Sequence, residues 1–192
     1  MQRLWTGAPP DPVPETTAKL PAMKSILSML VFCFVSVSSA AVAKPPVEVP
    51  IGGTLREATM QGLDGPQRKL SEFRGRPMII NVWASWCGPC RQEMGSLTRL
   101  ARSKLGKQVT MIGISTDDYP NAAKAFVRQA KTGFNHFIDR QLEMETMLGA
   151  GHLPLTLLID AQGRVLDKYY GAQEWDSPEA MRAIAKTLRL TL

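Results

Sequence analysis

Two cysteines stand two residues apart in the stretch NVWASWCGPCRQEM, where Cys87 and Cys90 enclose a Gly-Pro dipeptide. A short apolar run precedes them and apolar residues at helical spacing follow, which places the pair between a strand and a helix. The N-terminus of a helix has unpaired N–H groups and the positive end of the helix dipole. A thiolate at Cys87 would therefore be stabilised there, as a reactive cysteine requires.

Thiol–disulfide exchange is the chemistry that this spacing favours. Cys87 is expected to be exposed and to attack a disulfide, which gives a mixed disulfide with the partner. Cys90, expected to be more buried, then reaches back across one helical turn and resolves the mixed disulfide. The reverse cycle would form disulfides in the partner. Pro89 suits the first helical turn, where its missing N–H costs nothing.

A cysteine pair has three other common uses. A structural zinc site needs four ligands, and the sequence adds only His136 and His152, which are not at zinc-finger spacing. A haem attachment site needs a histidine directly after the second cysteine, where this chain has Arg91. An inert disulfide stays open, although the placement between strand and helix favours redox work. Thiol–disulfide exchange needs no metal and no bound cofactor, because the disulfide itself carries the two electrons, and none is expected for this function.

Hydrophobic periodicity predicts the elements that must position this pair. Residues 78–84 and 109–116 have the pattern of buried strands on either side of a helix that stops at Gly106. A strand, a helix and a strand within about forty residues form a βαβ unit, so the two strands should be parallel. Upstream, turn residues within 52–77 predict an N-terminal β-hairpin.

The C-terminal half is predicted to contain a helix, a small insertion made of a short strand and a short helix, a β-hairpin and a final helix. Their ranges are 120–131, then 134–139 with 141–149, then 155–160 with 165–170, and 176–190. Gly133 is expected to end the first of these helices and Gly163 to form the hairpin turn. Ser177 or Asp176 is expected to cap the last helix. This order predicts an α/β fold with a mixed central sheet flanked by helices.

The N-terminal part has the pattern of a targeting segment. After Met23, Lys24 supplies a positive region, residues 26–37 form an apolar run, and Ala41-Val42-Ala43 is a small-x-small cleavage site. We therefore expect residues 23–43 to be a signal peptide, with translation starting at Met23 and processing after Ala43. An uncleaved membrane anchor is the alternative, although the apolar run is short for a membrane span.

Processing would change the cysteine count, because Cys33 lies within the apolar run and would be removed. The mature chain would then hold only the pair at 87 and 90. Such a pair closes a tiny loop and stabilises the fold little, so it is there for chemistry or for a metal. Residues 1–22 are expected to be an upstream segment outside the native chain, and residues 44–50 a Pro-rich linker.

Charge and composition are less specific. The net charge is +6 over 192 residues, and the basic residues are spread along the chain, not clustered. This balance is compatible with an acidic partner but does not favour a nucleic-acid partner. Hydrophobic residues make up 44% of the chain, which is enough for a sizeable core.

The stretch WASWCGPC resembles the active site of the thioredoxin superfamily, whose fold has the element order predicted above. The resemblance extends over most of residues 51–192, which are expected to form a thioredoxin-like domain. The N-terminal hairpin, the insertion before LPLTLLID, the secretory signal and CGPCRQEM together resemble the TlpA-like extracytoplasmic branch. That branch implies a bacterial periplasmic thiol–disulfide oxidoreductase, which would be membrane-anchored if the signal stays uncleaved.

The resemblance also implies a surface for the partner. Superfamily members carry a cis-proline that faces the disulfide, and Pro154 in GHLPLTLLID matches its position. A cis bond there would expose the Leu153 backbone for pairing with the partner's chain, whereas a trans proline at a strand start is the ordinary alternative. Trp86 matches the aromatic residue beside the cysteines, and Gly88 and Pro89 complete the expected contact surface.

Two positions concern the proton of the second thiol. Cytoplasmic thioredoxins carry a buried Asp six residues before the first cysteine, and here that position is Asn81, which cannot titrate. The TlpA-like branch often has a Glu three residues after the second cysteine, and Glu93 matches it. One turn beyond Cys90, a partly buried carboxylate can pass a proton. The alternative is a surface Glu that the helix dipole favours.

The predicted function is reduction of disulfides in secreted proteins, among which the resemblance includes apocytochrome c. A reductant in an oxidising compartment needs electrons, so a membrane thiol carrier is the expected donor. The alternatives are a disulfide-forming oxidase and a copper-binding module that uses Cys87, Cys90 and His152. A peroxidase is disfavoured, because VWASWC lacks the proline that the peroxiredoxin motif places before its cysteine.

Overall fold

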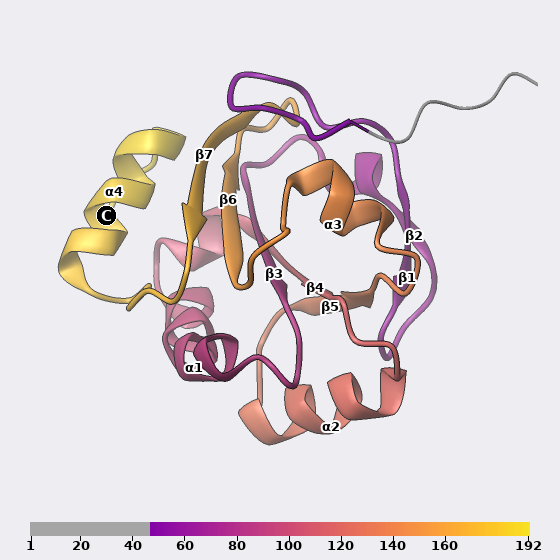
Figure 1. The fold of residues 1–192 in the computed structure, drawn as a ribbon. Helices are drawn as coiled ribbons and strands as arrows, with labels where there is room; N and C mark the ends of the chain where they lie inside the picture. Colours follow the sequence, from indigo (N-terminus) through magenta and orange to yellow (C-terminus); the bar gives the residue numbers. More distant parts are fainter. Residues whose placement is uncertain (1–46) are drawn as a thin grey trace, which may run out of the picture. The chain divides into compact units, whose positions relative to one another are not determined.

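The computed structural model of the chain describes residues 47–192. The predicted upstream segment, the signal peptide with Cys33 and the first part of the linker lie outside the described residues. Within the described part, one sheet of seven strands is flanked by four α-helices (Figure 1). The α/β fold expected from the sequence, with a mixed sheet flanked by helices, is confirmed.

The strands follow the order β2-β1-β5-β4-β3-β6-β7 across the sheet. Their bounds are Thr59–Gly62 (β1), Arg68–Lys69 (β2), Met78–Trp83 (β3), Thr110–Ser115 (β4), Asn135–Ile138 (β5), Leu155–Ile159 (β6) and Val165–Tyr170 (β7). The pairs β3–β4 and β4–β5 are parallel, and the other pairs are antiparallel. The parallel β3–β4 pair and the β1–β2 hairpin match the sequence prediction. The insertion contributes an interior strand, because β5 lies between β4 and β1.

The helices are Gly88–Arg102 (α1), Pro120–Ala130 (α2), Glu143–Leu148 (α3) and Pro178–Leu188 (α4), with short 3-10 turns at Leu70–Phe73 and Gly106–Gln108. All four helices end before their predicted last residue. Helix α1 stops before Ser103, whose hydroxyl donates to the Leu100 carbonyl and accepts from the Gly106 N–H, which begins a separate turn. Helix α2 stops before Lys131, which takes a left-handed conformation with φ of 51°, so Gly133 plays no part in ending it.

Alternation along the central strand β3 separates two apolar clusters. Met78, Ile80 and Val82 point to one face of the sheet, and Ile79 and Trp83 point to the other. All of these side chains are fully buried, because β3 has hydrogen-bonded neighbours on both sides and helices over both faces. The strand therefore contributes to the core on both faces and leads the chain to the cysteines after its end.

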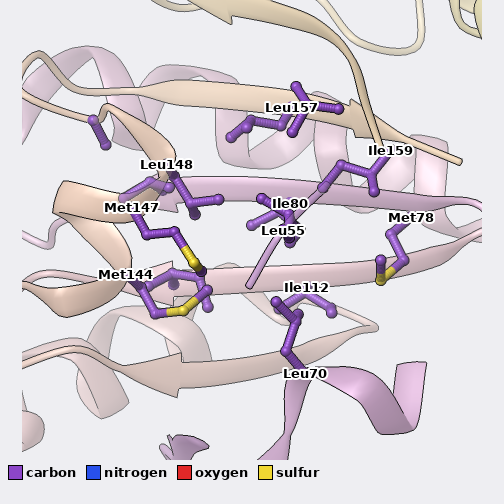
Figure 2. Close-up of a cluster of buried hydrophobic side chains, with 14 of the residues drawn as sticks. Leu55, Leu70, Met78, Ile80, Ile112, Met144, Met147, Leu148, Leu157 and Ile159 are labelled. Carbon is purple, nitrogen blue, oxygen red and sulfur yellow. The ribbon is translucent and has the colours of Figure 1, made fainter. Parts of the chain in front are cut away.

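The first cluster, here called the α3-side cluster, lies between the sheet and α3. Helix α3 covers it together with the N-terminal segment, and Figure 2 shows methionines of α3 against isoleucines and leucines of the sheet. Its members are Val49, Leu55, Met60, Leu70, Phe73, Met78, Ile80, Val82, Ile112, Ile114, Phe137, Met144, Met147, Leu148, Ala150, Leu155, Leu157, Ile159 and Val165. Val49 belongs to the segment predicted as a linker, and its N–H donates to the Met147 carbonyl over 2.8 Å.

The second cluster, here called the α1-side cluster, lies beneath α1, α2 and α4 and includes both cysteines. Its members are Leu63, Ile79, Trp83, Ala84, Cys87, Cys90, Met94, Leu97, Leu100, Leu105, Val109, Met111, Ala123, Ile138, Leu158, Trp175, Ile184, Ala185 and Leu188. Helix α4 begins as predicted, because the Ser177 hydroxyl accepts the Ala180 N–H and Pro178 occupies the first turn. The fold thus places the cysteines over one face of the sheet only.

Candidate active site around the Cys87–Cys90 disulfide

Cys87 and Cys90 form a disulfide, with a sulfur–sulfur distance of 2.05 Å, at the start of α1. Cys87 is the N-cap residue of this helix, and its Sγ accepts the Cys90 backbone N–H over 3.2 Å. Pro89 lies in the first turn, where a proline disrupts no helical hydrogen bond. The predicted position of the pair, between a buried strand and a helix N-terminus, is confirmed.

The two cysteine residues differ less in exposure than the sequence suggested. Cys87 was expected to be exposed, but only 5% of it is accessible, against 0% of Cys90. The expectation for Cys87 was wrong because the first turn of α1 packs into the α1-side cluster. The accessible surface beside the disulfide comes instead from Trp86, which is 70% exposed, and from Gly88 and Pro89, which are both exposed.

A buried carboxylate fixes the loop before the cysteines. Asp117, which follows β4, accepts the Ser85 N–H over 2.9 Å and the Ser85 hydroxyl over 2.6 Å. It also accepts the Ser115 hydroxyl over 2.7 Å. The sequence analysis did not single out Asp117, although β3 and β4 are parallel neighbours and their C-terminal ends must lie at the same edge of the sheet. That topology is the signal that could have found it.

The segment before β6 lies beside the end of β3. The Leu153–Pro154 peptide bond is cis, as the resemblance implied. Antiparallel pairing sets Val82 opposite Leu155, so Pro154 lies next to the chain that leads into the cysteines. Pro154 is buried, and Leu153 is partly exposed and contacts both apolar clusters. The structure therefore places Trp86, Leu153 and Pro154 at the same edge of the sheet.

Glu93 is the polar centre of the α1-side face. It is only 1% exposed, so it is not the surface glutamate that was the alternative. Its Oε1 accepts the Asn81 side-chain N–H over 2.7 Å. Its Oε2 accepts the Trp175 indole N–H over 2.9 Å and the Gln173 backbone N–H over 3.1 Å. Both carboxylate oxygens are therefore paired, and all three donors are neutral groups.

This environment perturbs the acidity of Glu93. Burial raises the pKa of its carboxyl above the usual 4.5, and the hydrogen bonds from Trp175, Gln173 and Asn81 each act in the opposite direction. Burial is the largest of these effects. Cys90 lies three residues earlier on the same helix, so the two side chains are neighbours on its surface. The arrangement combines a redox-active pair with a carboxyl that can change its protonation state.

Asn81 takes the place of a titrating group in this network. Its side-chain N–H groups also donate to the Thr156 hydroxyl over 2.9 Å, and the two residues are direct cross-strand partners in β3 and β6. Within residues 47–192 the Asn81 side-chain oxygen has no hydrogen-bond partner. Asn81 thus contacts Glu93 through an amide that stays neutral, so it can donate a hydrogen bond but cannot exchange a proton.

Sequence reasoning found Glu93 but missed Trp175, Gln173 and Thr156. Gln173 and Trp175 lie in the loop before α4, about eighty positions from Glu93, and no motif links the two segments. Thr156 could have been noticed as the polar residue within the apolar run LTLLI of β6. Contacts of such separation arise from the packing of α1 against that loop.

Neither histidine adds a ligand to the site. His152 is exposed, and His136 is buried near Trp83, where burial lowers the pKa of its imidazole to about 4. Throughout residues 47–192, no three histidine, cysteine, aspartate or glutamate side chains are grouped so as to hold a metal ion. The copper-binding alternative needed Cys87, Cys90 and His152 together, and the structure does not group them in that way.

Comparison with known proteins agrees with this geometry. The Redoxin family model matches residues 50–184. The thiol-disulfide oxidoreductase ResA of Bacillus cereus is 30% identical over 126 residues, which are 66% of this chain and 73% of that protein. The thiol:disulfide interchange protein DsbE of Pseudomonas fluorescens is 35% identical over 102 residues, which are 53% of this chain and 55% of that protein.

Solved structures show the same fold. A thiol:disulfide interchange protein from Bacteroides sp. aligns with a TM-score of 0.61 at 21% identity, covering 73% of this chain and 91% of that one. A secreted disulfide oxidoreductase of Mycobacterium tuberculosis, homologous to E. coli DsbE, aligns with a TM-score of 0.60 at 23% identity, covering 67% and 95%. The fold and the cysteine pair define a thioredoxin-like thiol–disulfide oxidoreductase. The chain belongs to the Redoxin family, and its relatives identify it as a TlpA-like member of the thioredoxin superfamily.

Proposed function

We propose that the protein reduces disulfides in other extracytoplasmic proteins, with Cys87 as nucleophile and Cys90 as resolving thiol. The observation that carries the proposal is a disulfide at the first turn of α1 with a buried carboxyl one turn further along that helix. The Gly-Pro dipeptide between the cysteines resembles that of reducing thioredoxins, and this resemblance supports the reducing direction.

The exchange proceeds in two steps that start from the dithiol. The Cys87 thiolate attacks one sulfur of the substrate disulfide, the substrate S–S bond breaks, and the other substrate sulfur leaves as a thiolate that takes up a proton. Cys90 then attacks the Cys87 sulfur, and the second substrate sulfur leaves and is protonated in turn. The substrate gains two electrons and two protons, and the Cys87–Cys90 disulfide forms.

Glu93 is proposed to handle the proton that Cys90 gives up in the second step. A carboxyl whose pKa is raised by burial can accept a proton at a higher pH than an ordinary glutamate can. Asn81 cannot serve in this way, because its amide does not titrate. Glu93 therefore supplies the proton acceptor that the aspartate of cytoplasmic thioredoxins supplies from the strand.

The substrate is proposed to lie across Trp86, Gly88, Pro89 and the Leu153–Pro154 segment. Trp86 offers a large exposed aromatic surface directly before Cys87, and Leu153 is partly exposed at the same edge of the sheet. An extended polypeptide could pair with the backbone beside Leu153 while its cysteine is joined to Cys87. Apocytochrome c and other secreted proteins are the substrates that the resemblance suggests.

The periplasm is the proposed compartment, with a membrane thiol carrier as the electron donor. The signal-peptide pattern in residues 23–43 supports export. In the described range, 47–192, no helix has the length and apolar character that crossing a membrane requires. The donor is testable in cells, since its deletion should shift the protein from dithiol to disulfide. An unchanged dithiol fraction would contradict the role of the carrier.

A trapping experiment tests the assignment of the two cysteines. The Cys90→Ser variant should accumulate a mixed disulfide between Cys87 and a substrate protein, because the resolving thiol is absent. The Cys87→Ser variant is the matched control, and it should form no such complex. Equal complex formation by both variants would contradict Cys87 as the nucleophile. Non-reducing electrophoresis followed by mass spectrometry of the joined peptides gives the readout.

A further inference from the structure

One stripe of α1 is bonded to the loop before α4. Glu93, Ser96 and Arg99 are spaced by three residues along the helix, so they lie on one side of it. Each of them contacts residues 173–176, here called the 173–176 loop. The loop thus attaches to the helix that carries the cysteines, along about two turns.

The three contacts differ in kind. The Ser96 hydroxyl donates to the Gln173 carbonyl over 3.1 Å. The Arg99 guanidinium donates to the Asp176 carboxylate over 2.5 and 3.0 Å and lies 3.6 Å from a Glu174 carboxylate oxygen, all at an exposed site. Exposed ion pairs of this kind contribute little to stability. The fully buried contact is the hydrogen bond from Trp175 to Glu93, so the loop can influence the site through that contact.

Trp175 makes the side-chain part of the buried contact. It is 2% exposed, and its ring packs edge-to-face against Tyr169 with centroids 5.5 Å apart. This packing fixes the indole with its N–H directed at the Glu93 carboxylate. A hydrogen bond to a charged group is stronger than one between neutral groups. Removing the donor from a buried carboxylate is costly, because no water replaces it.

We propose that Trp175 is a positioning residue for Glu93: its indole N–H orients the buried carboxylate and favours the charged, proton-accepting form. The inference rests on the proposed role of Glu93 in thiol chemistry. Trp175 acts through Glu93, to which its indole N–H donates. Without this donor, the carboxyl would stay protonated to a higher pH and would accept the Cys90 proton less readily.

Neutral groups face Glu93 from each neighbouring element. Strand β3 contributes the Asn81 amide, and the 173–176 loop contributes the Gln173 N–H and Trp175. On α1 itself, the nearest titratable neighbour is Cys90, one turn earlier. The charges of the loop are engaged with Arg99 at the surface. Within residues 173–176, Trp175 is therefore the one residue whose side chain donates a hydrogen bond to Glu93.

A second buried tryptophan provides a matched control. Trp83 is fully buried in the same cluster, but its indole N–H has no hydrogen-bond partner within residues 47–192. Replacing either tryptophan with phenylalanine removes one N–H and some buried apolar surface. Only at Trp175 does the removed N–H bond to a carboxylate. Effects shared by both variants therefore report packing, and effects confined to Trp175→Phe report the hydrogen bond.

The first measurement follows the indole N–H signals of Trp175 and Trp83 by ¹⁵N NMR of the oxidised wild-type protein. The Trp175 signal should shift with pH along the same curve as the ¹³C signal of the Glu93 carboxyl. The Trp83 signal should be flat above about pH 5, since its neighbour His136 has a pKa of about 4. A Trp175 signal that ignores the Glu93 titration would overturn the inference.

The second measurement compares the variants. Trp175→Phe should lower the acid dissociation constant of Glu93 about tenfold, as expected for loss of one hydrogen bond to a charged group. Trp83→Phe should leave it unchanged. The pH profile of thiol alkylation in the reduced protein should move in Trp175→Phe and stay in place in Trp83→Phe. Equal profiles in both variants would overturn the inference.

Glu93→Gln separates the inference from the proposed function. If Glu93→Gln leaves the alkylation profile unchanged, the proton role of Glu93 fails, whatever Trp175 does to its carboxyl. If Glu93→Gln moves the profile but Trp175→Phe moves neither the profile nor the carboxyl titration, the proposed function stands and the role of Trp175 fails. Movement of the profile in both variants, with no further effect of Trp175→Phe in the Glu93→Gln background, supports the two claims.

Discussion

The two faces of the sheet differ in what they bury. On the α3 side, methionines of α3 pack on apolar side chains of the sheet (Figure 2), and the buried polar groups Asp139 and Lys168 bond to the two ends of α3. The α1-side face buries a disulfide and, beside it, the carboxyl of Glu93 with the amide of Asn81. Both faces are built from the same strand, β3, whose residues alternate between them. The difference therefore follows from single positions along one strand and one helix.

The α3-side face serves stability, and the α1-side face serves chemistry. Burying a carboxyl costs free energy unless its oxygens are hydrogen-bonded, and beside α3 the Asp139 carboxylate accepts the N–H groups of Glu143 and Glu145. On the α1-side face, Glu93 has three neutral donors and still has a raised pKa. A core built only for stability would place an apolar residue there. The polar centre is consistent with a function that needs a proton acceptor.

The largest loss of activity is expected from a substitution on the α1-side face. Cys87→Ser should lower protein-disulfide reduction at least about a thousandfold, because a nucleophile and its resolving group act as a unit. The circular dichroism spectrum should stay that of the folded protein, since the α3-side cluster is untouched. Residual activity comparable with that of the wild type would contradict Cys87 as the nucleophile. Reduction of insulin, followed by turbidity, measures the activity.

The counterpart on the other face is Ile80→Ala. Ile80 is fully buried in the α3-side cluster, and its truncation should lower the free energy of unfolding by about 2–5 kcal/mol. Below the unfolding temperature, the pH profile of thiol alkylation should match that of wild type. Urea denaturation and alkylation kinetics test the two parts separately. A changed alkylation profile in the folded variant would show that the faces are not independent.

Glu93→Gln should reveal the cost of the buried carboxyl as a pH dependence of stability. Burial raises the pKa of Glu93 above 4.5 in the folded state, so the unfolded state loses its proton first as the pH rises. Between the pKa of Glu93 in the unfolded state and its higher pKa in the folded state, the wild type should therefore lose stability relative to Glu93→Gln as the pH rises. The loss should be about 1.4 kcal/mol per pH unit. Denaturation curves from pH 4 to pH 8 measure the difference between the two proteins. A constant difference would contradict a raised pKa.

The smallest effect on activity is expected at Trp86, which is exposed beside the disulfide. Trp86→Ala should change the free energy of unfolding by less than about 0.5 kcal/mol, because Trp86 is 70% exposed. The kcat/KM for a protein disulfide should fall about tenfold, as when one aromatic side chain is removed from an interface. The rate with glutathione disulfide, which is too small to need the tryptophan surface, serves as the control. An equal fall with both substrates would contradict a role in partner binding.

The sequence predicted more of the fold than of the hydrogen bonds around Glu93. The βαβ unit with the cysteines, the two hairpins and the cis bond before Pro154 followed from periodicity, turn residues and the family resemblance. Local signals misplaced the ends of α1 and α2, because Ser103 and Lys131 end these helices through side-chain hydrogen bonds and a left-handed turn. Such ends depend on the cap conformation, which residue type alone does not fix.

The network around Glu93 could not be read from the sequence. Its position after the cysteines pointed to Glu93, but burial of Cys87 and the hydrogen bond with Trp175 depend on how α1 packs. Trp175 lies in a loop without a motif, and a tryptophan there is as compatible with plain core packing. Only the geometry distinguishes its indole N–H, which is bonded, from that of Trp83, which has no partner in the described part of the chain.

The reduction potential of the Cys87–Cys90 pair decides between the reducing and the oxidising function. The chain that starts at Lys44 would be equilibrated with glutathione buffers of known ratio, and the dithiol fraction read by mass spectrometry after alkylation. A reductant that draws on a membrane donor should have a potential near that of thioredoxin, about −270 mV. A potential near about −120 mV would mark a disulfide-forming oxidant and would contradict the reducing function.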